Sequence, residues 1–97
     1  MLSFLKLFES KRFASSIKTR KFDKLMDRLP ARVQQDAQAA YARWRKDPSS
    51  VDFRSLAGAK NVWRISLSDG YRAMGLDKGD TIEWYWIGTH NDYENMT

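Results

Sequence analysis

Three short strand-like runs separated by two turn signals constrain the fold of this 97-residue chain more than any other feature. The runs cover residues 62–67, 71–76 and 81–87 and are rich in β-branched and aromatic residues. They are separated by Ser68-Asp69-Gly70 and by Asp77-Lys78-Gly79-Asp80. Glycine and aspartate tolerate the positive φ angles of tight turns, and connections this short join antiparallel neighbours. The stretch therefore predicts a three-stranded antiparallel meander.

The alternation of side chains along these strands predicts two unlike faces. In the first run, Trp63 and Ile65 lie opposite Arg64. In the third run, strict alternation groups Ile82, Trp84 and Trp86 on one side. One face is therefore apolar and needs a cover, whereas the other carries arginines beside aromatic and small residues. Such a face suits nucleic acid, and it equally suits an ordinary sheet with one solvated side.

Two amphipathic helices before the meander are the natural cover. The first begins after Thr19, a suitable N-cap, and has an apolar stripe at i, i+3, i+4 and i+7 formed by Phe22, Leu25, Met26 and Leu29. Pro30 ends it, and the second helix follows at residues 31–46. The stripe of this second helix consists of Val33, Ala37, Ala40, Tyr41 and Trp44.

The order of these elements predicts an α+β fold. It consists of an antiparallel sheet of about four strands, with an N-terminal helical hairpin packed on one face. Residues 51–57 are the fourth strand, residues 13–18 are a further strand candidate, and residues 91–96 are a candidate helical turn. We expect a single domain over residues 1–97, in which residues 1–12 form a loose extension.

Composition excludes several classes of protein and leaves one charge asymmetry. The chain has no cysteine and one histidine, which argues against disulfides and structural zinc and suits a reducing cytoplasm. No apolar run approaches the roughly 20 residues of a membrane span. Residues 1–48 carry 12 Lys and Arg against 5 Asp and Glu, whereas residues 49–97 carry 5 against 7. The basic first half fits a polyanionic partner, or simply the solvated faces of two helices.

Several motifs at fixed spacing resemble the RelE/ParE superfamily of bacterial toxins. They are Y-R-A-M-G at residues 71–75, W-Y-W-I-G at 84–88 and T-H-N-D-Y at 89–93, preceded by the helix pair F-D-K-L-M-D-R-L-P-A-R-V at 22–33. The resemblance covers roughly residues 16–96. It implies the toxin half of a type II toxin–antitoxin pair, with a cognate antitoxin as partner. In RelE-like members it implies a ribosome-dependent mRNA endonuclease, and in ParE-like members a protein that inhibits DNA gyrase.

The resemblance also implies site residues. Arg72 matches the arginine that faces the scissile phosphate in ribonuclease members, and Arg64 matches a second basic position on the preceding strand. His90 matches a C-terminal histidine that acts as acid or base, and Tyr93 stands near a C-terminal tyrosine or aspartate. The RNA-binding candidates are Arg54, Lys60 and Lys46. The chain departs from RelE itself in lacking its lysine-rich cluster, and Asn91 follows His90 where some relatives have tyrosine.

These residue types fit RNA cleavage that needs neither metal nor cofactor. The 2′-hydroxyl can attack the adjacent phosphate if cations stabilise the phosphorane and if a base and an acid handle the two protons. Arginine suits the first task, histidine suits the second, and Glu83 or Asp52 is a base candidate if it lies nearby. A structural interpretation stays open, in which Arg72 pairs with Glu83 on the next strand. A gyrase-binding toxin and a non-catalytic RNA-binding relative are the alternative functions.

Overall fold

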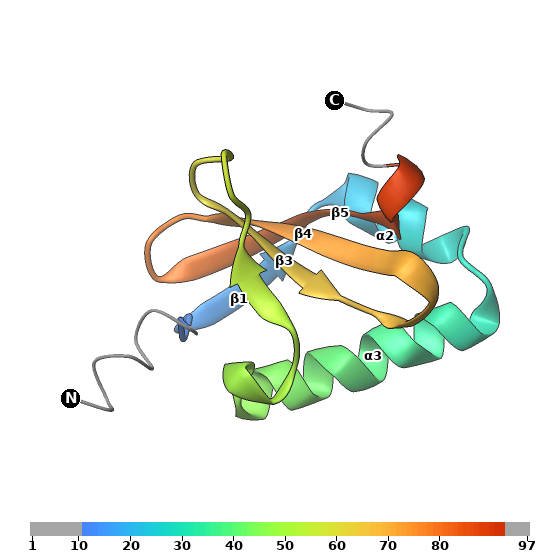
Figure 1. Ribbon diagram of the computed structural model, residues 1–97, viewed down its shortest axis with the longest axis horizontal. Helices are drawn as coiled ribbons and strands as arrows, with labels where there is room; N and C mark the ends of the chain where they lie inside the picture. Colours follow the sequence, from blue (N-terminus) through green and yellow to red (C-terminus); the bar gives the residue numbers. More distant parts are fainter. Residues whose placement is uncertain (1–10, 93–97) are drawn as a thin grey trace.

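The computed structural model describes residues 11–92. Along the chain, one short strand comes first, the helical hairpin follows, and the remaining strands with the meander come last (Figure 1). The strands are β1 (Ser15–Lys18), β2 (Phe53–Ser55), β3 (Val62–Ser66), β4 (Tyr71–Asp77) and β5 (Thr81–Thr89). The helices are α2 (Arg20–Asp27) and α3 (Ala31–Lys46), and two short 3-10 turns, η1 (Pro48–Ser50) and η2 (Ser68–Gly70), precede β2 and β4. The α+β class and each predicted element within the described residues are confirmed, with boundaries shifted by a few residues. The candidate helical turn at residues 91–96 extends beyond the described part, which ends in a turn at residues 90–92.

The sheet has five strands in the order β1-β5-β4-β3-β2, and it is mixed rather than purely antiparallel. The meander β3-β4-β5 is antiparallel as predicted, and β2 extends it next to β3. The prediction of about four antiparallel strands is corrected by β1, which runs parallel to β5 from Ser15↔Thr81 to Lys18↔Trp84. A parallel pair joins segments far apart in sequence, so no turn signal marks it.

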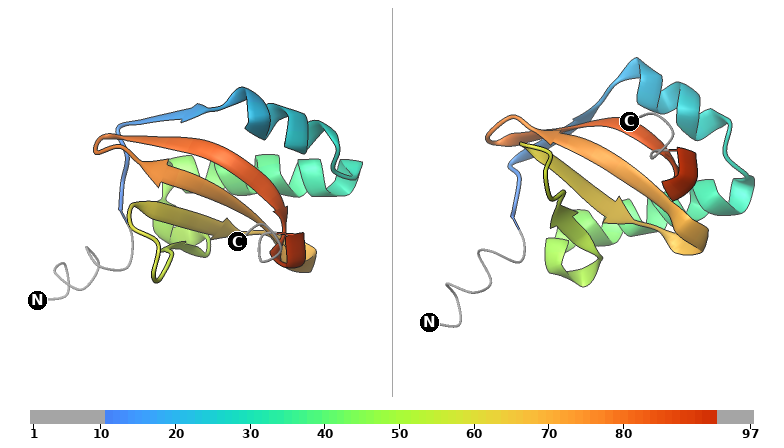
Figure 2. Two further views of the ribbon diagram at one scale, coloured as in Figure 1. Left: turned by 90° about the horizontal axis from the view of Figure 1, so that it is seen from above. Right: turned by 45° about the horizontal axis from the view of Figure 1, so that its top comes forward.

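Both helices pack on one face of the sheet, as Figure 2 shows in two orientations. The Thr19 hydroxyl accepts a hydrogen bond from the Phe22 amide at 3.1 Å and caps α2, and Pro30 separates the two helices. Four residues of the predicted α3 stripe are buried, namely Val33, Ala37, Ala40 and Trp44. The fifth, Tyr41, is 42% exposed, which corrects its assignment to the core.

An aromatic cluster forms the centre of this helix–sheet interface. The Trp44 ring lies 5.5 Å from Phe53 and 5.4 Å from Trp84, both in tilted or edge-on geometries that aromatic rings favour. Phe13 joins from the segment before β1, with its ring 6.5 Å from Trp44. The indole Nε1 of Trp44 has no hydrogen-bond partner among the described residues, so this side chain stabilises the fold through its apolar area.

A β-bulge separates the two tryptophans that strict alternation placed together. Met74 pairs with Trp86, whereas the next residue, Gly75, pairs with Trp84, so β5 has one extra residue, Tyr85, at this point. The bulge shifts the alternation by one position. Trp84 therefore packs in the core under the helices, and Trp86 lies on the opposite face, which corrects the predicted grouping of Ile82, Trp84 and Trp86.

Two glycines make room for these tryptophans. A Cβ at Gly75 would lie 2.6 Å from the Ile82 side chain and 3.0 Å from Trp84, and a Cβ at Gly88 would lie 2.8 Å from the Trp86 ring. Side chains on both faces of β5 thus lie directly against the backbone of neighbouring residues. The glycines of Y-R-A-M-G and W-Y-W-I-G are therefore packing positions on the two faces of the sheet.

The segment before β1 is tied to the β4–β5 turn. Lys11 Nζ contacts both carboxylate oxygens of Asp77 at 3.1 and 2.9 Å, and Asp77 also accepts hydrogen bonds from Trp63 Nε1 at 3.2 Å and from the Gly79 amide at 2.8 Å. Burial raises the pKa of Asp77, but the hydrogen bonds from Lys11, Gly79 and Trp63 outweigh it, so the net pKa is lowered. Lys11 thus lies in a defined place, whereas residues 1–10 of the extension predicted for residues 1–12 lie outside the described residues.

We expect Asp77→Asn to weaken this contact. We also expect the free energy of unfolding of the variant to fall less steeply than that of the wild type as the pH is lowered. Because the folded pKa lies below the unfolded value of about 3.9, the contribution is present above that pH and is lost as the pH falls through the folded pKa. The loss at neutral pH should be about 1–3 kcal/mol, the usual effect of removing one partner of a charged hydrogen bond. Urea titrations between pH 3 and 7 measure both effects, and an unchanged pH slope would contradict the assignment.

Candidate functional site

The face of the sheet opposite the helices carries three arginines in adjacent strands, and we call it the arginine face. The registers align Arg54, Arg64, Met74 and Trp86 in one row across β2, β3, β4 and β5. The next row contains Ser66, Arg72 and Gly88. Arg64 and Arg72 are therefore diagonal neighbours on one face, a relation that places Cα atoms about 7–8 Å apart. The structure brings these two predicted residues together.

Asp52 holds the first two arginines in place. Arg54 and Arg64 are direct cross-strand neighbours, an arrangement in which like charges repel. The Asp52 carboxylate lies between them, 2.8 Å from Arg54 Nε and 3.5 Å from Arg64 Nη1, and Arg64 also donates to the Ser66 hydroxyl. Burial raises the pKa of Asp52, but the charges of Arg64 and Arg54 lower it by more than burial raises it. The net pKa therefore lies below its usual value. Asp52 is thus a weak base and serves to orient Arg64.

Arg72 is the cation of the arginine face that has no counter-ion among residues 11–92. Its side chain is half-buried, and within residues 11–92 it makes no ion pair and no side-chain hydrogen bond. Its neighbours across the strands are Ser66 and Gly88, neither of which is charged. The alternative pairing with Glu83 does not occur, because Glu83 lies opposite Leu76 and bonds to Lys78 at 3.2 Å. A guanidinium partly removed from water and left unpaired is suited to binding an external anion.

His90 lies just past the same edge of the sheet. It follows Thr89, the last residue of β5, and begins the helical turn at residues 90–92, whose Asp92 amide donates to the Thr89 hydroxyl at 3.1 Å. Gly88, the cross-strand partner of Arg72, precedes it by two residues, and the His90 side chain is exposed. This turn stands at the end of the sheet where β4 begins (Figure 1). Tyr93 lies outside the described residues.

The three predicted RNA-binding residues are dispersed. Arg54 is exposed on the arginine face beside Arg64. Lys60 is exposed in the loop between β2 and β3, and Lys46 ends α3 in the helical layer on the other side of the sheet. Only Arg54 therefore shares a surface with Arg72. Among residues 11–92 no cluster of three or more potential metal-ligating side chains occurs, and no helix in that range has the length and apolarity to cross a membrane.

Two features of this face were not predicted from the sequence. They are the contact of Ser66 with Arg64 and the position of Trp86 on the arginine face. Ser66 contacts Arg64 and lies opposite Arg72, and a serine in a strand carries no distinctive signal. Trp86 is 4% exposed and pairs with Met74, so both are buried apolar side chains on the arginine face of the sheet. Its position depends on the bulge, which has no marker in the sequence.

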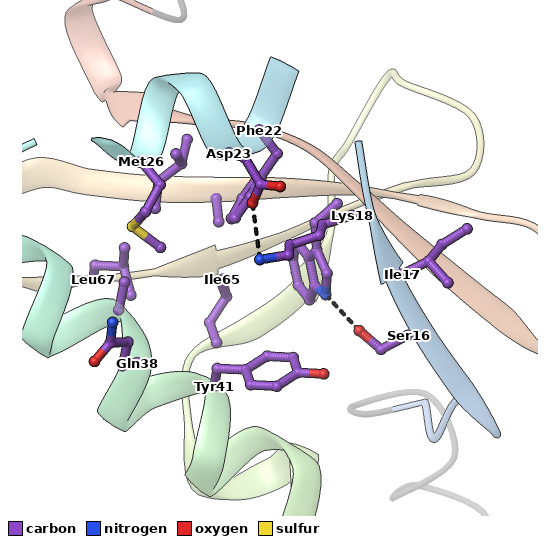
Figure 3. Close-up of a pocket in the computed structure, with 14 residues that line it drawn as sticks. Ser16, Ile17, Lys18, Phe22, Asp23, Met26, Gln38, Tyr41, Ile65 and Leu67 are labelled. Carbon is purple, nitrogen blue, oxygen red and sulfur yellow. Dashed lines mark hydrogen bonds and ion pairs between the residues drawn. The ribbon is translucent and has the colours of Figure 1, made fainter. Parts of the chain in front are cut away.

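A separate pocket opens on the helical side, between α2, α3 and β1 (Figure 3). It has a volume of about 370 Å³ and mostly apolar walls, including Phe22, Met26 and Ile65. The Lys18–Asp23 ion pair at 2.8 Å and the hydrogen bond from Trp84 Nε1 to Ser16 at 3.0 Å lie at its border. None of the site residues predicted from sequence lines it, so it is distinct from the arginine face.

Comparison with known families identifies the chain. The sequence profile of the ParE-like toxin domain matches residues 31–95, which is more than half of the sequence. The chain belongs to the ParE-like toxin family. The predicted membership of the RelE/ParE superfamily is thereby confirmed. Comparison with curated protein sequences finds no match for the toxin.

Solved structures share the fold of the toxin at low sequence identity. The RelB–RelE antitoxin–toxin complex from Methanococcus jannaschii superposes with a TM-score of 0.69 at 17% identity, covering 82% of the toxin and 96% of the matched chain. The isolated Escherichia coli RelE toxin gives 0.60 at 17% identity and covers 89% and 96%. The RelE–RelB complex from Pyrococcus horikoshii gives 0.57 at 15% identity and covers 81% and 96%. At these identities the likeness establishes the fold.

Proposed function

We propose that the toxin is one half of a type II toxin–antitoxin pair and that it cleaves mRNA on the ribosome through the arginine face. The observation that carries this proposal is the half-buried Arg72, which has no counter-ion within residues 11–92 and stands diagonal to Arg64. Two guanidinium groups on one rigid sheet can contact different oxygens of one phosphate. A binding surface without chemistry would require no such convergence. His90, two residues after the cross-strand partner of Arg72, supplies a group suited to proton transfer.

The reaction that fits these groups is transesterification within the RNA. The 2′-oxygen forms a bond to the adjacent phosphorus and gives up its proton to a base, and the P–O5′ bond breaks as the 5′-oxygen gains a proton. The products are a 2′,3′-cyclic phosphate and a 5′-hydroxyl. Arg72 stabilises the charge that develops on the phosphorane, and Arg64, oriented by Asp52, binds a second phosphate oxygen. His90 protonates the leaving oxygen.

The partner in this proposal is an antitoxin that neutralises the arginine face. Two of the solved relatives are complexes of RelE with the antitoxin RelB. An amphipathic helix or an added strand from a small acidic protein is the mode of recognition that we expect. This proposal predicts a short reading frame for a small acidic protein beside the toxin gene. The product of that reading frame should co-purify with the toxin.

His90→Ala is expected to lower the rate of mRNA cleavage by about 10²–10⁴-fold, the usual contribution of a general acid or base. The measurement is to induce the wild type and the variant in bacteria, to follow growth, and to map transcript 5′ ends. Asn91→Ala on the same turn is the matched control and should cleave like the wild type. Growth arrest by both proteins with intact transcripts would remove the proposed role of His90.

A second candidate function is inhibition of DNA gyrase by binding, and the family match favours it because the matching domain is described as ParE-like. This function predicts induction of the DNA-damage response, inhibition of supercoiling by purified gyrase, and full toxicity of His90→Ala. A harmless phenotype on expression of the wild type would instead favour a non-catalytic RNA-binding relative.

A further inference from the structure

The helical hairpin accounts for the entire net charge of the toxin. Residues 20–46 contain 8 Lys and Arg and 3 Asp, a net charge of +5, which equals the net charge of the whole chain. The remaining residues contain 9 Lys and Arg against 9 Asp and Glu. The strongest electrostatic feature of the molecule therefore belongs to the layer opposite the arginine face, and the proposed cleavage site does not use it.

Four of these cations form one face of α2 and its C-cap, which we call the α2 basic face: Arg20, Lys21, Lys24 and Arg28. At 100° per residue these four positions lie within one third of the helix circumference, away from the apolar side of Phe22 and Leu25. All four side chains are exposed, and within residues 11–92 none makes an ion pair or a side-chain hydrogen bond. Asp23 and Asp27 lie outside this arc, and Asp23 pairs with Lys18.

The position of two of these cations is unfavourable for the helix itself. Arg20 and Lys21 occupy the first turn of α2, next to the positive end of the helix dipole, where each cation costs about 0.3–1 kcal/mol. The basic residues in the last turn of α3, such as Arg43 and Arg45, have an ordinary explanation because they stabilise a helix C-terminus. Cations placed where they destabilise the helix point to a role outside the fold.

We propose that the α2 basic face is a second, non-catalytic surface that binds the phosphate backbone of folded RNA. This inference rests on the proposed function only for the identity of the RNA, which is ribosomal. The α2 basic face and the arginine face lie on opposite layers of the molecule, so one extended strand cannot occupy both (Figure 2). A toxin seated in a groove of folded RNA can contact phosphates with α2 while the sheet holds the mRNA.

A protein partner fits this surface less well. The cores of protein interfaces are depleted in lysine and enriched in apolar and aromatic residues. The exposed large apolar side chains of the described part are Ile17 and Tyr41, and both line the pocket rather than the α2 basic face. An unbroken row of cations along a helix is instead typical of phosphate-backbone contacts.

The test compares two triple variants of equal charge in an Arg72→Ala background, which removes cleavage from the measurement. The first carries Arg20→Gln, Lys24→Gln and Arg28→Gln, and the control carries Arg12→Gln, Arg43→Gln and Arg45→Gln. Binding to purified ribosomes is measured between 50 and 200 mM salt, with circular dichroism as the check on folding. The α2 variant should bind ribosomes at least about 10-fold more weakly at low salt. The slope of log binding constant against log salt concentration should decrease in magnitude by about two to three. The control should change less than about twofold.

Each outcome decides the inference separately from the proposed nuclease. Equal binding by the α2 variant and the control overturns it, as does a parent protein that does not bind ribosomes. Loss of affinity for the antitoxin with unchanged ribosome binding also overturns it and makes the α2 basic face a protein surface. If ribosome binding depends on α2 but the wild-type toxin cuts no mRNA, the nuclease proposal fails and the RNA surface stands.

Discussion

Arg72→Ala is expected to abolish the toxicity of this chain while leaving its fold intact. A guanidinium that stabilises the developing charge on a phosphorane contributes about 10²–10³-fold to the rate, as single oxyanion-stabilising donors do. Arg72 makes no ion pair or side-chain hydrogen bond within residues 11–92, so its removal breaks no contact that stabilises the sheet there. The measurement is the rate of transcript cleavage on purified ribosomes, together with the thermal midpoint of unfolding.

Two further variants make this prediction specific. Arg72→Lys keeps the charge but loses the planar fork that can bind two oxygens, so we expect partial activity. Arg45→Ala removes an exposed cation from the last turn of α3 and should cleave at the wild-type rate. If Arg72→Ala cleaves as fast as Arg45→Ala, the arginine face is not the site of catalysis. A midpoint that falls sharply in Arg72→Ala would instead assign the residue a structural role.

Trp44→Ala should have the largest effect on stability, about 3–5 kcal/mol, as is typical when a buried tryptophan is truncated. The ring is 2% exposed and contacts aromatic residues from the segment before β1, from β2 and from β5, so its loss leaves a cavity between the helices and the sheet. Domains of this size have unfolding free energies of about 5–15 kcal/mol in total. The variant should therefore unfold at a much lower denaturant concentration or fail to accumulate.

Trp44→Phe is the matched control for this prediction. Since the Trp44 Nε1 has no partner among the described residues, phenylalanine removes no hydrogen bond there and keeps most of the apolar contact. We expect a loss of no more than about 1.5 kcal/mol, the range of conservative apolar exchanges in a core. Equal losses in the two variants, read from urea titrations, would show that the indole nitrogen has a role that the fold does not reveal.

The sequence determined the elements of this protein because their signals are local. The apolar stripe of α2, the Thr19 cap and Pro30 depend on residues within a few positions of one another, and so do the two turns of the meander. The motifs around Arg72 and His90 likewise predicted the superfamily, which the family match confirms. The candidate roles of these residues remain predictions that the variants above test.

Tertiary structure alone decided how these elements meet. The parallel pairing of β1 with β5 joins residues about 66 positions apart, as the Ser15–Thr81 hydroxyl contact illustrates, and nothing near either strand encodes it. The bulge at Tyr85 placed Trp84 and Trp86 on opposite faces, because one extra residue inverts every later side chain of a strand. Register also placed Arg72 between Ser66 and Gly88 rather than beside Glu83, and so left it without a counter-ion within the described residues. Patterns within a strand specify its two faces, whereas only the packed sheet specifies which charges become neighbours.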